Sequence, residues 1–327
     1  MNRAKRHPAR RSSSRSQARG GFTLVELLLV IGLITILLGL TLVVGGRVRF
    51  QARTIGCMNN QRQVNTGNFT FASDNDGTFL SPRTAPNYEA GFGSTNPDCV
   101  RGGEYFRLWT KSFDESGADR MVDTVNGNEE RELALTDGAA FEYIGDISAY
   151  KSPLDPTTRV RSYAINAYIG ELCPDNLGDK ISGNACLDQG WRAARSLSAL
   201  PQPNKTLMTI CEEDSAGHNN QGFMIKNWLS ECNTGTPPNE MWFDYPAPWV
   251  EDGVTLSFCD GSTLFYQFKK KDLGNFLIEN FNTGAGNHRA YYPGEPGIEW
   301  DETNSDWYWF KDRMLPGVGA NSAWGGG

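Results

Sequence analysis

Glu26 is the side chain whose type and position most clearly suggest chemistry, because it is the only charged residue in the apolar run over residues 22–44. An ionised carboxylate at the centre of a bilayer costs at least about 2.5–3.5 kcal/mol, and less nearer the interface. If the run enters a membrane, Glu26 needs a cationic partner. Proteolysis between Gly21 and Phe22 would supply one, since the new α-amine would lie one helical turn from Glu26 or beside the Glu26 of a neighbouring subunit.

The apolar run around Glu26 is long enough to form a membrane-spanning helix. Its 23 residues, at about 1.5 Å per residue, make a helix of roughly 34 Å, and the hydrocarbon core of a bilayer is about 30 Å thick. Residues 1–21 carry seven Lys or Arg and no Asp or Glu, which predicts a basic leader that forms no core. The positive-inside bias then predicts a single-pass protein with a cytoplasmic N-terminus and its remainder outside.

These features resemble the N-terminus of type IV pilins and type II secretion pseudopilins. The resemblance rests on the basic leader, Gly21, the following Phe22-Thr23-Leu24-Val25-Glu26 and the apolar helix. It implies that a membrane-embedded prepilin peptidase cleaves after Gly21 and methylates the amine of Phe22. It also implies that Glu26 pairs with the amine of an adjacent subunit, so that the partners are other copies or related pseudopilins in the inner membrane.

An ordinary signal peptide and a plain signal anchor stay open as alternatives for this N-terminus. A secretory signal peptide has a shorter apolar run and a cleavage site between small residues, for which Gly39-Leu40-Thr41 is a poor match. A signal anchor accounts for the helix and for its basic flank. Neither of them explains the position of Glu26.

Composition limits what the rest of the chain does. The 327 residues have a net charge of −7, and loss of the leader would make it about −14. So acidic a chain is not expected to bind nucleic acid, because phosphate contacts need clustered Lys and Arg. The 36 Gly, 16 Pro and 9 Trp favour many turns and short strands. The region after the helix is large enough for one domain with long insertions.

The helix is expected to continue outside the membrane over residues 45–73. A rough three-four spacing is kept by Val48, Ala52, Ile55, Met58, residues 61–65, Phe69 and Ala72, and it predicts that this half of the helix packs on the exterior domain. The run of capping and turn residues at 73–77 then ends the helix.

The exterior domain, residues 74–327, is predicted to be α+β, with an antiparallel sheet packed on the long helix. Strands are expected within 160–168, at 206–211, and as a hairpin over 253–259 and 263–268, and a short helix is expected at 129–135. The segments 57–63 and 71–77 resemble a subgroup of pseudopilin-like proteins from planctomycetes and verrucomicrobia. In that subgroup a Cys is expected where this chain has Ser152, and a His where it has Val250.

Seven cysteines allow up to three disulfides in an exported domain: Cys57, Cys99, Cys173, Cys186, Cys211, Cys232 and Cys259. The pair Cys173 and Cys186 brackets a polar loop and is the best candidate for one bridge. The other connections cannot be deduced from sequence. No paired CxxC motif is present, so a structural zinc site is not expected.

Oxygen-rich turns offer a candidate Ca²⁺ site. Glu213, Asp214 and Asp260 follow two predicted strands and have the ligand type that Ca²⁺ prefers. Solvated turns account for the same residues and are the favoured interpretation. The three His, at positions 7, 218 and 288, lie in the leader or in loop-like settings, and no hydrolase, zinc-protease or phosphate-loop motif occurs, so no enzyme is expected.

The tail at 300–327 is rich in aromatic residues, most of which are expected to cover the core. An exposed aromatic cluster would instead suit a glycan or protein partner. A second functional hypothesis therefore stays open beside the pilin-like structural subunit. It is a membrane-tethered exterior binding module that uses the same processing signal.

Overall fold

The structure is a computed structural model that describes residues 21–82, 84, 100–101, 104–105, 107–111, 128–170, 194, 196–200, 202–213, 222–223, 225–227, 240–242, 244–247, 249–250, 252–281 and 302–314. The chain divides into two compact units, Met1–Arg49 and Phe50–Gly327. The leader at 1–20 lies outside the described residues. So do the side chains of residues 40–44, within the helix.

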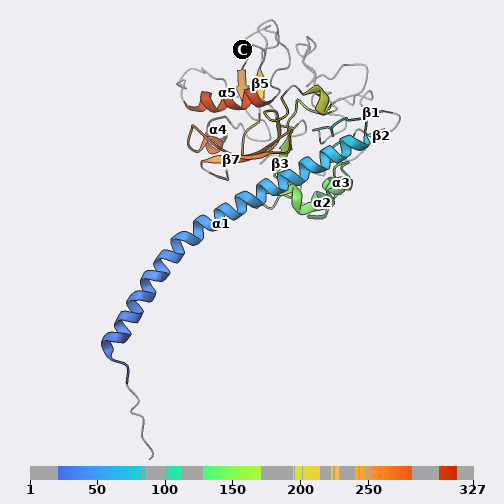
Figure 1. The fold of residues 1–327 in the computed structure, drawn as a ribbon. Coiled ribbons are helices and arrows are strands. Elements are labelled where there is room, and N and C mark those ends of the chain that lie inside the picture. Colours follow the sequence, from blue (N-terminus) through green and yellow to red (C-terminus); the bar gives the residue numbers. More distant parts are fainter. Residues whose placement is uncertain are drawn as a thin grey trace, which may run out of the picture. The chain divides into compact units, whose positions relative to one another are not determined.

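The long helix α1, Leu24–Asp74, confirms that a helix begins just after Gly21 and continues through the region predicted to be exterior (Figure 1). It ends at the predicted turn. Asp76 and Gly77 adopt left-handed backbone angles, with φ of 55° and 79°, and the Gly77 amide donates to the Ala72 carbonyl at 2.8 Å. Within the described part of the chain, no helix meets the combined requirements of length and apolarity for crossing a membrane.

A four-stranded antiparallel sheet is the centre of the second unit. The strands β3 (Tyr163–Ile165), β4 (Leu207–Cys211), β7 (Gly253–Phe258) and β8 (Thr263–Gln267) lie in the order β3-β4-β7-β8. This confirms the α+β class, the antiparallel sheet and the β7–β8 hairpin. The strand expected within 160–168 is shorter, three residues long.

Both faces of the sheet are covered. The β7 residues Thr255 and Ser257 point to one face, where Gln61 and Asn65 of α1 meet them. Val254 on the same strand pairs with Tyr266 of β8, and Tyr266 meets α5. Because alternate residues face opposite sides, every residue of β7 is buried.

The α1 face that packs on the sheet differs in part from the predicted one. Val48, Ala52 and Ile55 are exposed, whereas the buried positions are Thr54, Cys57, Gln61, Val64, Asn65, Asn68, Phe71 and Ala72. These follow a regular three-four spacing, so a helical face does pack on the sheet. The prediction was wrong for Val48, Ala52 and Ile55. It is confirmed for Gln61, Asn65 and Ala72, which are buried.

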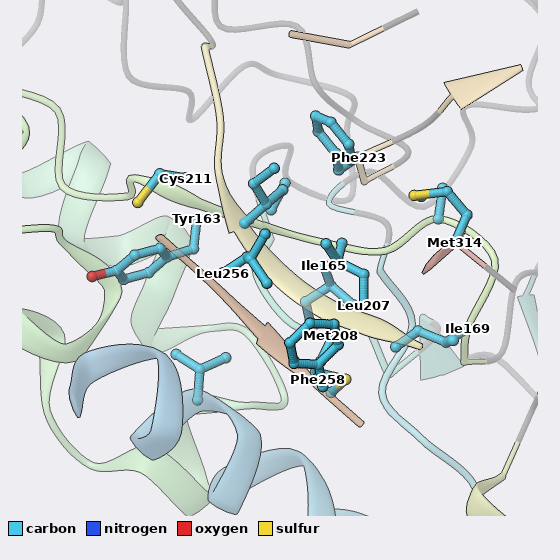
Figure 2. Packing of buried hydrophobic residues seen from close by; sticks show 14 of the residues in the cluster. Tyr163, Ile165, Ile169, Leu207, Met208, Cys211, Phe223, Leu256, Phe258 and Met314 are labelled. Atoms are coloured by element: carbon cyan, nitrogen blue, oxygen red, sulfur yellow. The ribbon is translucent and has the colours of Figure 1, made fainter. Parts of the chain in front are cut away.

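The helix α5, Glu302–Met314, covers the other face together with the small sheet of β5 (Ile225–Asn227) and β6 (Glu240–Trp242). Trp307, Phe310 and Met314 are fully buried, and the Phe310 ring lies 5.3 Å from the Trp242 ring. The expectation that tail aromatics cover the core is confirmed for Trp307 and Phe310. Figure 2 shows how the buried side chains of β3, β4 and β7 gather in this core.

Smaller elements complete the described chain: β1 (Val100–Arg101), β2 (Glu104–Tyr105), α2 (Asn128–Thr136), α3 (Phe141–Ile144), η3 (Ile147–Tyr150), η5 (Leu197–Ala199) and α4 (Leu273–Phe281). The helix α2 confirms the one expected at 129–135. Gly67 lets α3 approach α1, because a Cβ atom there would lie 2.6 Å from a side-chain carbon of Ile144.

Candidate functional site

Thr23 and Glu26 form a reciprocal hydrogen-bonded pair at the start of α1. The Glu26 carboxylate accepts from the Thr23 amide at 2.8 Å and from the Thr23 hydroxyl at 2.8 Å. The Thr23 hydroxyl in turn accepts from the Glu26 amide at 3.2 Å. This is a capping box, in which two side chains satisfy backbone amides that have no partner within the helix.

The expected cleavage site directly precedes this capping box. Gly21 and Phe22 are non-helical, and both are exposed, Phe22 to 78%. A Cβ atom on Gly21 would meet nothing within 4 Å, so the described neighbours leave this backbone open. A protease needs an accessible peptide, and Gly21 and Phe22 are accessible in the described part of the chain.

The first part of α1 exposes a continuous set of large apolar side chains. The exposed residues are Leu24, Val25, Leu27, Leu28, Leu29, Val30, Ile31, Leu33, Ile34, Ile36, Leu37 and Leu38. They occur at almost every position and so surround the helix on all sides rather than forming one stripe. A helix that is apolar all round is normally buried in a large core or in a membrane.

The second part of α1 is held to the sheet by a polar seam formed by Gln61, Asn65 and Asn68, which are all buried. The Gln61 amide group donates to the Thr255 carbonyl at 3.1 Å, and the Asn65 amide group donates to the Phe258 carbonyl at 3.0 Å. Because these bonds reach main-chain atoms of β7, they fix how far along the strand the helix lies.

Two further bonds tie the polar seam to its surroundings. The Ser257 hydroxyl donates to the Asn65 side-chain oxygen at 3.0 Å, and the Leu80 amide donates to the Asn68 side-chain oxygen at 2.9 Å. A side-chain amide has both a donor and an acceptor group. Asn65 therefore donates a hydrogen bond through its nitrogen and accepts another through its oxygen. Sequence reasoning placed Gln61 and Asn65 in the helical pattern, but it missed Asn68 and did not predict the side-chain bonds to the main chain of β7.

Cys57 lies at the end of the polar seam, in a buried pocket between α1 and the sheet. Its sulfur is 2.8 Å from the Thr255 hydroxyl, 3.0 Å from the Ser152 hydroxyl and 3.4 Å from the Cys211 sulfur. The Tyr163 hydroxyl is also near, at 3.3 Å. Tyr163 and Cys211 are paired across β3 and β4, and Figure 2 shows them on these neighbouring strands.

The two thiols respond differently to this pocket. Burial raises the pKa of Cys57, but hydrogen bonds from its neighbours to the sulfur outweigh this effect and lower its pKa to about 7. Burial raises the pKa of Cys211 well above its usual value, and the contact with Cys57 adds to the rise. Cys57 is therefore the thiol that ionises first.

The loop after Ser152 is organised by the ion pair of Asp155 and Arg159. The Arg159 guanidinium donates to the Asp155 carboxylate at 2.8 Å and to the Glu212 carbonyl at 2.7 Å. The Asp155 carboxylate also accepts from the Ser162 hydroxyl at 2.6 Å and from the Thr157 amide at 2.8 Å. Burial raises the pKa of Asp155, but the Arg159 charge and these hydrogen bonds outweigh it and hold the pKa below its usual value.

The candidate Ca²⁺ ligands are only partly described. Asp260 lies in the β7–β8 turn, where its carboxylate accepts from the Ser262 amide at 2.9 Å and from the Ser262 hydroxyl at 2.6 Å. Glu213 is buried, and its amide donates to the Tyr245 carbonyl. Asp214 lies outside the described residues. Among the residues that the structure describes, no three His, Cys, Asp or Glu side chains come close enough to hold a metal ion.

The expected disulfide pair and the aromatic tail are also only partly described. Cys173 and Cys186, the expected disulfide pair, both lie outside the described residues. In the aromatic tail, Trp309 stacks on Tyr266 with ring centres 3.8 Å apart, and the Arg313 guanidinium covers Trp309 at 3.8 Å. These rings are occupied by contacts within the chain.

Comparison with known proteins gave no match to the chain among family models, curated proteins or solved structures.

Proposed function

We propose that this chain is a pilin-like or pseudopilin-like structural subunit of a type II secretion or type IV pilus-like system. Residues 22–44, which include the first part of α1, hold it in the inner membrane, with the N-terminus in the cytoplasm and the sheet-containing unit outside. A prepilin peptidase cleaves between Gly21 and Phe22 and methylates the new amine. Copies of the chain, or related subunits, then assemble through their apolar helices.

The exposed apolar part of α1 is the observation that carries the proposal. Twelve large apolar side chains between residues 24 and 38 are exposed, and they surround the helix. An exposed surface of this kind on a folded chain marks an interaction with a membrane or with another protein. The apolar part of the helix would contact lipid while the chain is in the bilayer, and it would contact the helices of other subunits after assembly.

Glu26 gives the apolar helix its alignment. In the single chain its carboxylate is held by Thr23 at the helix N-terminus. After cleavage the α-amine of Phe22 is the nearest cation in sequence, and in a bundle the amine of the neighbouring subunit reaches the same carboxylate. Charge pairs in apolar surroundings contribute more to register than to stability. Misaligned helices would leave Glu26 unpaired, and assembly selects the aligned arrangement.

The polar seam supports the role of the second unit. One face of residues 54–72 is buried, and Gln61 and Asn65 on this face donate side-chain hydrogen bonds to main-chain atoms of β7. Such bonds prevent the helix from sliding along the strand.

Cross-linking between copies tests the proposal. A photo-reactive residue replaces Val30 in the full chain, which is expressed with a prepilin peptidase, and membranes are irradiated. Cross-linked dimers and higher forms are expected, and Glu26→Ala should reduce their yield at least about tenfold, as loss of a charge partner in an apolar site costs more than about 1.4 kcal/mol. A probe at the exposed Arg62 is the matched control for random collision. Equal yields for wild type and Glu26→Ala would contradict the proposal.

A further inference from the structure

Cys57 and Cys211 form a pair of buried thiols that join two elements far apart in sequence. Their sulfur atoms are 3.4 Å apart, and the residues are 0% and 2% exposed. Cys57 comes from α1 and Cys211 from the last position of β4. Both are free thiols in the structure.

We propose that Cys57 and Cys211 form a disulfide in the exported protein, which links α1 covalently to β4. The proposal rests on the exterior location given under the proposed function, because disulfides persist in oxidising compartments. A disulfide has an S–S distance of about 2.05 Å, so the sulfurs need to approach by only about 1.4 Å. Both sulfurs already contact the Thr255 hydroxyl, so the two side chains face the same buried site.

The described cysteines provide an internal comparison. Cys259 is also fully buried, but its sulfur faces the Leu207 carbonyl at 3.8 Å and the Met208 sulfur at 3.9 Å. Cys57 instead faces a thiol and three hydroxyl groups. Thr255 contacts both sulfurs, Cys57 at 2.8 Å and Cys211 at 3.1 Å. Among the three described cysteines, the geometry therefore selects this pair.

The oxidant is a disulfide of small-molecule or enzyme origin, written RSSR. The Cys57 thiolate attacks one sulfur of RSSR, so that a mixed disulfide forms and one RS⁻ leaves. The Cys211 thiolate then attacks the Cys57 sulfur, the Cys57–Cys211 bond forms, and the second RS⁻ leaves. The two cysteine protons end on the two RS⁻ groups. The protein thiols lose two electrons, and RSSR gains them. Burial requires that this exchange precede the final packing of α1 on the sheet.

Peptide mapping of the full chain tests the pairing. Cells are lysed in N-ethylmaleimide, and the chain is extracted in detergent, digested without reduction and examined by mass spectrometry. The expected product is the Cys57 peptide linked to the Cys211 peptide, two hydrogens lighter than their sum. Cys259→Ser should leave this product unchanged. Recovery of Cys57 and Cys211 as maleimide adducts, or of Cys57 linked to any other cysteine, would overturn the inference.

A second sample separates this inference from the proposed function. The chain is reduced, unfolded, and refolded in oxidised glutathione before mapping, which removes any dependence on cellular location. Pairing in both samples supports the disulfide. Absence from both overturns it, and the N-terminal mass of the same samples still reports processing independently. If the two cysteines pair only after refolding, the disulfide does not form in the cell, and the result counts against the exterior location. The two thiols would then still be close enough in the folded chain to form a bond.

Discussion

The carboxylate of Glu26 accepts hydrogen bonds from both the amide and the hydroxyl of Thr23, each at 2.8 Å. The same carboxylate is the proposed partner of the Phe22 amine once the chain is cut. The Glu26 side chain therefore has two proposed roles at the N-terminus of α1. It caps the helix in the single chain, and it supplies the charge that aligns subunits. The two uses differ in what they require, because capping needs an acceptor and pairing needs a negative charge.

Glu26→Gln separates these two uses. Glutamine at this position still accepts a hydrogen bond from the Thr23 amide, so the capping box is retained. It carries no charge and cannot pair with the amine of a neighbour. We expect the Val30 cross-link to fall as far in Glu26→Gln as in Glu26→Ala. Thr23→Ser, which retains the hydroxyl, should leave the cross-link yield unchanged. A cross-link that survives in Glu26→Gln but not in Glu26→Ala would assign Glu26 to capping alone.

Asn65→Ala tests the polar seam. The change leaves the Phe258 carbonyl without its Asn65 donor and the Ser257 hydroxyl without its Asn65 acceptor, in a buried site. We expect the free energy of unfolding to fall by about 1–3 kcal/mol. Urea unfolding of the full chain in detergent, followed by tryptophan fluorescence, measures the loss.

Asn59→Ala is the matched control for this variant. Asn59 is an exposed asparagine on the same helix, and its side-chain oxygen accepts from the Arg62 guanidinium at 3.1 Å, one turn along the helix surface. The effect of this change on the free energy of unfolding should lie within about 0.5 kcal/mol. Helix propensity alone would favour Ala over Asn in both variants. Equal losses for both variants would therefore show that the contact with β7 is not what distinguishes Asn65.

The ion pair of Asp155 predicts a pH dependence. The pKa of Asp155 is lowered in the folded state, so the unfolded chain binds the proton more readily. The stabilisation by Asp155 is therefore complete above its unfolded pKa of about 3.9 and is lost as pH falls through the lower folded value. Asp155→Asn should be less stable than wild type at pH 7, and the difference should shrink below about pH 4. A difference that stays constant from pH 7 to pH 3 would contradict this.

The hairpin and the end of the helix could be predicted because local residues determine them. The Asp260-Gly261-Ser262 turn places a glycine at φ 85°, and the Asp260 carboxylate holds the Ser262 amide. The strand order β3-β4-β7-β8 could not be predicted in this way. It joins β4 to β7 across more than forty residues, and no local pattern encodes such pairing.

The side-chain bonds of the helix face and the capping box were missed for two different reasons. Gln61, Asn65 and Asn68 are polar, and only the sheet main chain shows why they are buried. Thr23 and Glu26, by contrast, fit the pattern of Ser or Thr followed three residues later by Glu or Gln before an apolar run. That signal was present in the sequence. The charge of Glu26 suggested a partner in a membrane, and its role as a cap was overlooked.

The most direct test of the central claim is the intact mass and N-terminal sequence of the membrane-extracted chain, made with and without a co-expressed prepilin peptidase. We predict a chain that begins at N-methylated Phe22 only when the peptidase is present. Glu26→Ala should still be cleaved, because Glu26 is proposed to act in assembly. A chain that retains Met1 in the presence of the peptidase, or one that is cut after residue 40, would contradict the account.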